Sequence, residues 1–376
     1  MGNKIIKKIV HISTVHSWRD PRIFDKECCS LADQNFDVTL ITPDGINEKV
    51  RGVSVLQMSP FYKFRLLRST ISSYYIVKQA LALNPHIIHF HDPEIIPAAL
   101  FFKNKNVKFV YDIHEDYVTD IKQKKYVPFF LRNIIAFITR FFERRAHKSF
   151  TTIIAEKYYG KIFPTAKEIL NYPIIDWSKD IVPDRENATQ VLYTGNITKD
   201  RGAMIHSDIL MNVDRSTVSG ITMIGRCEKK LSQKMMNYIG KDNLDRLNII
   251  GIDDFIEFDK IIDEYKKGKW IAGLAIFPKT PHYAEKHLTK FFEYMAAGLP
   301  IIYSNYEEWE NLLKPLDVGI SINPSDKDGI SEAVRLLKTD QKLRKRMALN
   351  GRDAVLKKFN WKTEAEKLVF LYESIS

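Results

Sequence analysis

Short apolar runs alternate with longer amphipathic stretches along the first half of the chain. The apolar runs predict strands at 8–13, 37–42, 53–57, 86–90, 107–112, 151–154 and 167–170. The stretches between them predict helices at about 20–34, 65–83, 93–103, 127–148 and 156–163. Repeated strand–helix units favour a parallel sheet with helices on both faces.

The same pattern restarts near residue 190. A second set of parallel strands is expected at 190–194, 220–224, 247–250, 271–276, 300–303 and 318–321. Between the two sets, residues 171–188 hold Pro173, Pro183 and a run of charges, which is typical of a linker. The sequence thus predicts an α/β protein of two doubly wound domains, 1–172 and 173–359, that face each other across a cleft. Ligands are expected there, at the carboxyl ends of the strands.

Two acids stand at helical spacing late in the second set. Glu285 and Glu293 are eight positions apart in a stretch that turns helical and stops at Gly298. A helix that begins at Glu285 puts both carboxylates roughly on one face, whereas one that begins near His287 leaves Glu285 in a loop. In both cases backbone N–H groups lie between the acids, and helix N-termini favour anions. A nucleotide sugar offers such a site both a diphosphate and hydroxyls.

A simpler interpretation is that Glu285 caps a helix and Glu293 is an ordinary surface residue. Against it, four apolar residues surround Glu293, namely Phe291, Phe292, Met295 and Ala296. We therefore expect the Glu293 carboxylate to lie away from the solvent face.

Four further motifs accompany the two acids in a fixed order. They are Asp20-Pro-Arg-Ile-Phe-Asp-Lys-Glu27, His89-Phe-His91-Asp92-Pro-Glu94, Tyr111-Asp-Ile-His114-Glu115 and Gly195-Asn-Ile-Thr-Lys-Asp-Arg201-Gly202. With these motifs and the Glu-x7-Glu segment, nearly the whole chain resembles the retaining nucleotide-sugar glycosyltransferases of glycosyltransferase family 4. The resemblance implies the GT-B fold, in which two Rossmann-like domains bind acceptor and donor, respectively. It also implies that a last helix, 360–376, crosses back onto the first domain.

The resemblance also assigns roles to the donor side of the cleft. Glu293 is expected to accept hydrogen bonds from the ribose hydroxyls, and Glu285 to contact the transferred sugar near its reacting carbon. Gly195 opens the glycine motif, and Arg201 is expected on the donor diphosphate, where a guanidinium forks onto phosphate oxygens. Lys290 is expected to supply a second cation.

Other carried-over roles concern the first domain. His114 is expected to reach the donor sugar or its phosphate, and with Glu285 it forms the candidate catalytic pair. Asp20, Arg22 and His91 are the candidates on the acceptor side. In this family the leaving diphosphate is thought to take the acceptor proton, so no side-chain general base is expected. The chain departs from the usual pattern at Asn196, where a basic residue is expected, so one phosphate contact is in question.

Composition limits the class of protein. With 376 residues, 45% hydrophobic and 27% charged, the chain suits a globular protein of two domains. No apolar run is long enough to span a bilayer, and the N-terminus lacks a signal-peptide pattern. Cys28, Cys29 and Cys227 have neither metal nor redox spacing, which favours a reducing cytoplasm. The lone Asp326-Lys-Asp328 is expected to cap a helix, so neither a metal nor another cofactor is expected.

The net charge of +11 is uneven along the chain. Residues 121–148 carry a single acid, Glu143, against eight basic residues, Lys122, Lys124, Lys125, Arg132, Arg140, Arg144, Arg145 and Lys148. Apolar residues interleave with them, and residues 61–68 repeat the pattern. Two interpretations stay open: a helix that binds an anionic membrane surface, or a core helix whose polar side is basic. No nucleic-acid module accompanies the charge, so a nucleic-acid partner is not expected.

These features together predict an enzyme. No Gly-x-Gly occurs, which excludes an ordinary NAD dehydrogenase. The expected activity is retaining transfer of a hexose from a nucleotide sugar, most readily a UDP- or GDP-sugar, to a glycan or lipid-linked acceptor. Cell-surface polysaccharide biosynthesis in the cytoplasm, at the inner face of the membrane, is the expected setting. The alternatives are a sugar-nucleotide epimerase of the same fold and a non-catalytic relative that binds anionic surfaces, for which Asn196 is a hint.

Overall fold

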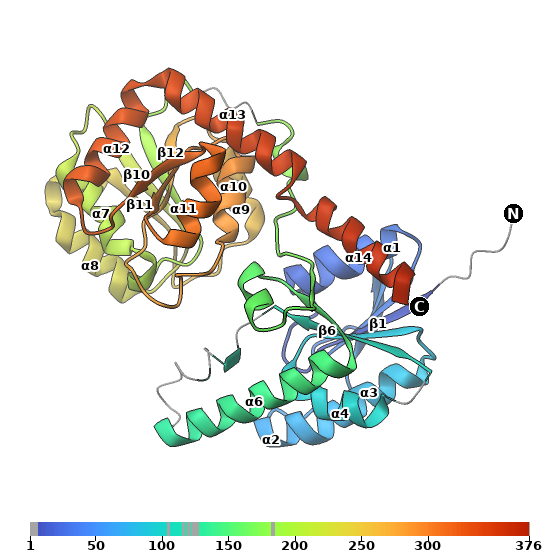
Figure 1. Cartoon of the computed structure of the whole chain (residues 1–376). Coiled ribbons are helices and arrows are strands. Elements are labelled where there is room, and N and C mark those ends of the chain that lie inside the picture. Colours follow the sequence, from blue (N-terminus) through green and yellow to red (C-terminus); the bar gives the residue numbers. More distant parts are fainter. Residues whose placement is uncertain are drawn as a thin grey trace, which may run out of the picture. The chain divides into compact units, whose positions relative to one another are not determined.

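The computed structural model describes residues 7–103, 106–114, 117–118, 121, 128–181 and 185–375. The chain divides into two compact units, the first formed by Met1–Asn171 with Trp361–Ser376 and the second by Tyr172–Asn360 (Figure 1). These divisions lie within one residue of 172 and 360. Within the predicted linker, residues 182–184, including Pro183, lie outside the described residues.

The first unit is built on an eight-stranded sheet of order β3-β4-β2-β1-β5-β6-β7-β8. Its strands are β1 (Lys8–Ile12), β2 (Asp37–Thr42), β3 (Glu48–Val50), β4 (Val53–Gln57), β5 (Ile87–Phe90), β6 (Lys108–Ile113), β7 (Thr151–Ile154) and β8 (Lys167–Glu168). All neighbouring strands are parallel except β3, which runs antiparallel to β4 at the edge. Strands such as β5 are buried throughout because helices cover both faces of the sheet.

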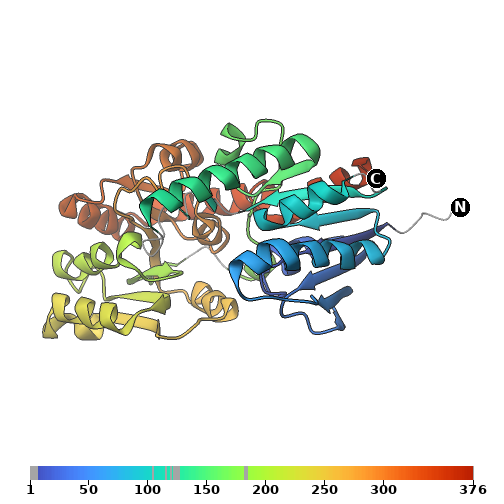
Figure 2. The same cartoon turned by 90° about the horizontal axis from the view of Figure 1, so that it is seen from below.

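Helices flank this sheet on both sides. Those of the first unit are η1 (Pro21–Cys28), α1 (Cys29–Asp33), α2 (Arg65–Leu67), η2 (Arg68–Ser72), α3 (Ser73–Ala82), η3 (Pro93–Ile95), α4 (Ile96–Phe102), α6 (Phe129–Ser149), η4 (Lys157–Lys161) and α14 (Trp361–Ile375). One face is covered by α3, α4 and α6, whereas α1 and α14 pack together on the other (Figures 1 and 2). The terminal helix α14 thus belongs to the first unit, as the resemblance implied. Among the helices that the structure describes, none is both long and apolar enough to cross a bilayer.

The second unit has a fully parallel six-stranded sheet of order β11-β10-β9-β12-β13-β14. Its strands are β9 (Gln190–Thr194), β10 (Gly220–Cys227), β11 (Leu247–Ile252), β12 (Trp270–Ala275), β13 (Ile301–Ser304) and β14 (Gly319–Ile322). The main helical segments are η6 (Lys199–Arg201), α7 (Ala203–Asn212), α8 (Lys229–Ile239), α9 (Phe258–Lys266), α10 (Thr289–Ala296), α11 (Glu307–Leu313), α12 (Lys327–Thr339) and α13 (Gln341–Lys357). One face is covered by α7, α8 and α12, and α10 with α13 lies on the other (Figure 1).

Two doubly wound α/β units confirm the predicted fold class. Every predicted strand is present, and most lie within about two residues of their expected limits. The sequence analysis missed β3, a three-residue edge strand whose Glu48 and Lys49 are exposed, so no apolar run marks it. It also extended the eighth strand to residue 170, whereas β8 ends at Glu168.

Each sheet has a point at which its strand order reverses. In the first sheet this point lies between β1 and β5, and in the second between β9 and β12. Loops that leave these strands diverge to opposite sides, which opens a crevice where open α/β sheets bind ligands. The predicted site residues His91 and Gly195 directly follow β5 and β9, respectively.

Candidate functional site

Gly195 is the centre of the donor-side candidates. It leaves β9 with a φ of +93°, a left-handed conformation that favours glycine. A methyl group at this position would lie 3.8 Å from Lys290 Nζ and 3.9 Å from Arg201 Nη1. The fold therefore brings together three predicted residues from separate segments. They form one positively charged corner at the carboxyl end of β9.

Lys290 is buried on the first turn of α10. Its Nζ donates to the Thr194 carbonyl oxygen at 2.7 Å and lies 3.8 Å from the centroid of the Tyr193 ring. Burial, reinforced by the charge of Arg201, holds the pKa of Lys290 well below its usual value. A bound anion would oppose both effects, because it stabilises the ammonium form.

Arg201 is held by a tyrosine from the loop before α10. Its Nε donates to Tyr283 Oη at 3.2 Å, and that hydroxyl donates to Asp200 Oδ2 at 2.8 Å. Burial lowers the pKa of Arg201, but the hydroxyls of Tyr193 and Tyr283 raise it by more. The guanidinium is therefore a fixed cation beside Lys290.

Gly202 explains how Arg201 reaches this corner. Its φ is +81°, and a Cβ at this position would lie 1.9 Å from the Ile276 carbonyl oxygen. The start of α7 is thus pressed against the chain that leaves β12. No other residue fits there without a shift of backbone.

Glu293 lies in the second turn of α10, which begins at Thr289. Of the two helix starts considered above, the later one is therefore nearer the structure, and Glu285 is outside the helix. The Glu293 carboxylate is half-buried and accepts a hydrogen bond from Tyr265 Oη at 2.9 Å. Tyr265 Oη also lies 2.9 Å from Thr194 Oγ1, so Glu293 is linked to the carboxyl end of β9.

Glu285 is exposed in the same loop as Tyr283, two residues further along the chain. It therefore stands next to the residue that holds Arg201. Its contact with a sugar hydroxyl stays a prediction.

Three tyrosines of this site were not foreseen from the sequence. Tyr265 and Tyr283 orient Glu293 and Arg201, respectively. Tyr294 Oη accepts from the Thr194 amide at 3.0 Å and donates to the Leu274 carbonyl at 3.2 Å, which ties β9 to β12. No motif marks these hydroxyls, because they come from different elements and meet only in the folded unit.

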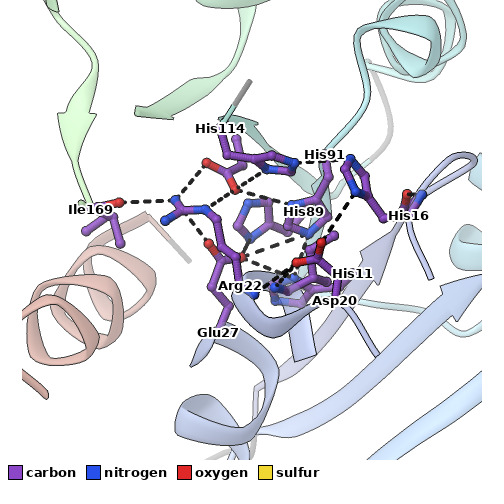
Figure 3. Close-up of polar contacts among 12 residues, drawn as sticks. His11, His16, Asp20, Arg22, Glu27, His89, His91, His114 and Ile169 are labelled. Atoms are coloured by element: carbon purple, nitrogen blue, oxygen red, sulfur yellow. Dashed lines mark hydrogen bonds and ion pairs between the residues drawn. The ribbon is translucent and has the colours of Figure 1, made fainter. Parts of the chain in front are cut away.

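In the first unit, polar side chains gather beyond β1, β5 and β6 (Figure 3). His114, the candidate that follows β6, has Nδ1 3.0 Å from Asp112 Oδ2. Its Nε2 lies 3.1 Å from His16 Nε2. Asp112 fixes one side of the His114 ring, and the other side faces the loop after β1.

His16 is a site residue that the sequence analysis missed. Besides His114, its ring approaches Asp20 Oδ2 at 3.5 Å and Asp92 Oδ1 at 3.4 Å. Asp20 also caps η1, because its Oδ1 accepts from the amides of Arg22 and Ile23. Burial raises the pKa of Asp20, but bonds from His16 and the backbone outweigh it and lower the pKa. The spacing of His16 and Asp20 was the available signal, because they stand four positions apart just before a predicted helical segment.

Arg22 and His91 lie beneath this surface. Arg22 is 5% exposed, and His91 is fully buried between His11 and Asp112. Both support Asp112, which in turn orients His114. Their burial keeps Arg22 and His91 from contacting a ligand directly, unlike the third predicted acceptor-side residue, Asp20, which is partly accessible.

A buried histidine cluster continues below His91. His11 and His89 face each other in the register of β1 and β5, and Glu27 Oε2 lies 3.8 Å from the Nδ1 atom of each. His89 also bonds to Tyr372 of α14. Burial lowers the pKa of His11, His89 and His91, so the cluster holds neutral rings.

This cluster contains the residue types that hold metal ions. His11, Glu27, His89 and His91 offer atoms within 4.8 Å of one another, as do His91, Asp112 and His114. Arg22 Nη2, however, lies 3.2 Å from Glu27 Oε1 and 2.9 Å from Asp112 Oδ1. This permanent cation already pairs with both acids and repels a second cation. Metal-independent chemistry stays a prediction.

Comparison with known proteins agrees with the two-unit architecture. The family model Glycosyltransferase Family 4 matches residues 22–157, and the model Glycosyl transferase-like matches residues 233–369. No curated protein matches the chain in sequence.

Solved structures cover nearly the whole chain. Sucrose-phosphate synthase from Thermosynechococcus elongatus is 16% identical with a TM-score of 0.73, over 98% of this chain and 99% of that one. HepE of Anabaena in complex with UDP is 12% identical with a TM-score of 0.69, over 98% and 100%. WaaG, a glycosyltransferase involved in lipopolysaccharide biosynthesis, is 14% identical with a TM-score of 0.67, over 96% and 98%. At these identities, the likeness shows a common fold.

Proposed function

Because the chain belongs to the glycosyltransferases of the family 4 type and has their GT-B fold, we propose that it is a retaining hexosyltransferase. Its donor is a nucleotide diphosphate sugar, with UDP- or GDP-sugars preferred, and its acceptor is a glycan or a lipid-linked sugar. One observation carries the donor proposal: Lys290 and Arg201 converge on Gly195 at the point where the strand order reverses.

The diphosphate is proposed to bind at this corner. Arg201 and Lys290 supply two cations, and Gly195 has no side chain to block a phosphate from the backbone. Burial and the charge of Arg201 lower the pKa of Lys290 by more than the Glu293 carboxylate raises it, and a bound phosphate would raise this pKa. Lys290 thereby takes the place of the basic residue that Asn196 replaces.

The two acids are proposed to hold hydroxyls. Glu293, fixed by Tyr265 at 2.9 Å, accepts from the ribose hydroxyls, and exposed Glu285 contacts the transferred sugar. Structures of HepE with UDP and with UDP-glucose support a nucleotide-sugar donor for this fold.

The proposed transfer needs no protein base. The bond from the anomeric carbon to the diphosphate oxygen breaks, and a new bond forms to the acceptor oxygen on the same face. The acceptor proton passes to the departing diphosphate. Arg201 and Lys290 stabilise the negative charge that develops there, as fixed cations do in a preorganised site.

The acceptor is proposed to approach Asp20 and His16, and neighbouring His114 is proposed to reach the donor sugar or its phosphate. These side chains lie at the carboxyl ends of β1 and β6 and offer donors and acceptors to hydroxyls. Cell-surface polysaccharide synthesis is the proposed pathway, in line with the role of WaaG in lipopolysaccharide biosynthesis. The cytoplasmic side of a membrane is the proposed location.

The test of donor binding is a thermal-shift panel with UDP, GDP, ADP, CMP and dTDP. A nucleotide at a hundred times its dissociation constant stabilises a fold by about 2.7 kcal/mol. We expect one nucleotide to stabilise the wild type and to lose this effect with Arg201→Ala or Glu293→Ala. Arg215→Ala is the matched control, because Arg215 pairs with exposed Asp245 elsewhere in the same unit. Equal stabilisation of all variants would reject the site.

Once donor binding is established, activity is tested by analysing the product that the donor sugar forms. Incubation of the donor with a glycan acceptor should yield a product with retained anomeric configuration. A converted donor sugar in the absence of acceptor would identify a sugar-nucleotide epimerase instead. Neither conversion, with donor binding intact, would indicate a non-catalytic relative.

A further inference from the structure

The long helix α6 exposes an apolar stripe that changes into a cationic one. Ile134, Phe137 and Phe141 are 52%, 73% and 53% exposed. Arg144 and Lys148 continue the stripe and are also exposed. Steps of three and four residues keep all five side chains on one side of a helix.

More exposed apolar side chains lie on elements around α6. Phe64 and Leu66 are 67% and 65% exposed at the start of α2, and Phe101 of α4 is 73% exposed. Helix α4 contacts both α3 and α6, and α2 lies along the same side of the unit (Figure 1). We call these residues with the α6 stripe the α6 face. A contiguous run of exposed apolar side chains, as along α6, marks an interaction surface.

The charge of the α6 face has one sign. Helix α6 contains a single acid, Glu143, which is buried and lies 3.1 Å from Arg140. The exposed cations at its C-terminal end are Arg144, Arg145 and Lys148. Lys122, Lys124 and Lys125, which precede the helix in sequence, lie outside the described residues.

We propose that the α6 face docks on an anionic lipid bilayer. Apolar side chains from Leu131 to Phe141 enter the boundary between headgroups and acyl chains, and the cations from Arg144 to Lys148 meet lipid phosphates. A second copy of this face complements it less well, because the described part of α6 exposes no acid to meet the cations from Arg144 to Lys148. Of the two interpretations left open by the sequence, exposed Phe137 favours the membrane helix over a core helix.

This inference gives the proposed lipid-linked acceptor a location, and to that extent it rests on the proposed function. Its test uses neither donor nor acceptor. A failure of lipid binding is therefore distinguishable from a failure of sugar transfer.

The experiment is co-sedimentation of the full chain with vesicles. One set contains equal parts of phosphatidylglycerol and phosphatidylcholine, and the other contains phosphatidylcholine alone. Binding is measured at low and high salt, with folding of each variant checked by circular dichroism. We expect binding to the anionic vesicles that falls as salt rises.

Two matched pairs of variants identify the surface. Arg144→Gln with Arg145→Gln should weaken binding about thirtyfold, since each cation near an anionic surface contributes about 1 kcal/mol. The control is Lys229→Gln with Lys230→Gln, an exposed basic pair on α8. Phe137→Ala should weaken binding about tenfold, because it removes apolar area that would become buried when the α6 face docks on the membrane. Its control is Phe370→Ala on α14, whose side chain is equally exposed at 73%.

Three results would overturn the proposal. One is no binding of the wild type to anionic vesicles. Another is equal weakening by the target and control variants. The third is a concentration-dependent dimer that Phe137→Ala dissolves without any vesicle binding, which would assign the face to self-association.

Discussion

Arg22 and Asp112 form a two-point ion pair, with Nε 2.9 Å from Oδ2 and Nη2 2.9 Å from Oδ1. Burial raises the pKa of Asp112, but Arg22 and the two neighbouring histidines outweigh it and hold the pKa well below its usual range. The same carboxylate orients His114, so the pair connects the motif after β1 with the candidate catalytic histidine. Arg22 therefore affects His114 indirectly, through Asp112.

Replacing Arg22 should destabilise the protein strongly. Arg22→Met leaves Asp112 buried and unpaired, and loss of one partner of a buried pair costs about 3–5 kcal/mol. Urea unfolding should show this loss. The double variant Arg22→Met with Asp112→Asn should recover part of it, because the Asp112 side chain is then no longer a buried charge. A loss below about 1 kcal/mol in the single variant would contradict a buried pair of this strength.

The buried histidines should make stability depend on pH. Burial lowers the pKa of His11, His89 and His91 below 6.5, so the unfolded chain binds protons first as pH falls. Their contribution is fully present above about 6.5 and declines below it, by about 1.4 kcal/mol per pH unit for each histidine. Glu27 acts in the opposite direction because burial raises its pKa.

Urea unfolding from pH 7.5 to pH 5 checks this slope. His89→Gln should reduce it by about one proton. An unchanged slope in that variant would show that His89 is not the group that titrates.

Glycine is required at position 202 but not at every glycine of the second unit. Gly202→Ala should cost more than about 3 kcal/mol, because the new Cβ meets the Ile276 carbonyl at 1.9 Å. Gly268, in contrast, has no positive φ and nothing within 4 Å of a new Cβ. Gly268→Ala should therefore change the stability by less than about 0.5 kcal/mol. Thermal unfolding of the two variants measures the difference, and equal losses would contradict the close contact at Gly202.

Lys290 should discriminate diphosphates from monophosphates. Lys290→Met removes one charged contact, which should weaken binding of the preferred nucleoside diphosphate about tenfold to a hundredfold. Binding of the matching monophosphate should change less, because it lacks the outer phosphate that Lys290 is proposed to contact. Calorimetric titration of both nucleotides tests this, with Lys234→Met, an exposed lysine of α8, as the control. Equal losses of affinity for both nucleotides would show that Lys290 does not act on the outer phosphate.

The sequence predicted both sheets because parallel strands buried on two faces read as apolar runs, as β5 and β12 show. It also singled out Gly195, Arg201 and Lys290, which the fold brings close together, because each stands in a local motif or beside one. Tyr265 and His16 could not be predicted in this way, because neither stands beside its partner in the sequence. Their partners, Glu293 and His114, are 28 and 98 residues away in the chain, and only the folded sheet brings them together.

Replacing Glu285 should mainly lower kcat, whereas replacing Glu293 should mainly weaken nucleotide affinity, although one motif contains both residues. Glu293 is linked to β9 through Tyr265, beside the proposed nucleotide, whereas Glu285 lies in the exposed loop after Tyr283. If Glu285 contacts the transferred sugar, Glu285→Gln should lower kcat about a hundredfold, as the loss of one well-placed contact in a transition state does. It should leave the affinity for the free nucleoside diphosphate within about twofold, because that ligand has no sugar to contact.

Steady-state kinetics with the intact donor and titration with the nucleoside diphosphate give the two quantities. Glu293→Gln is the matched comparison, and it should weaken nucleotide affinity about tenfold. The same loss of nucleotide affinity in both variants would move Glu285 to the nucleotide, and an unchanged kcat in Glu285→Gln would remove it from the reaction. Either result would assign the sugar contacts to residues other than Glu285.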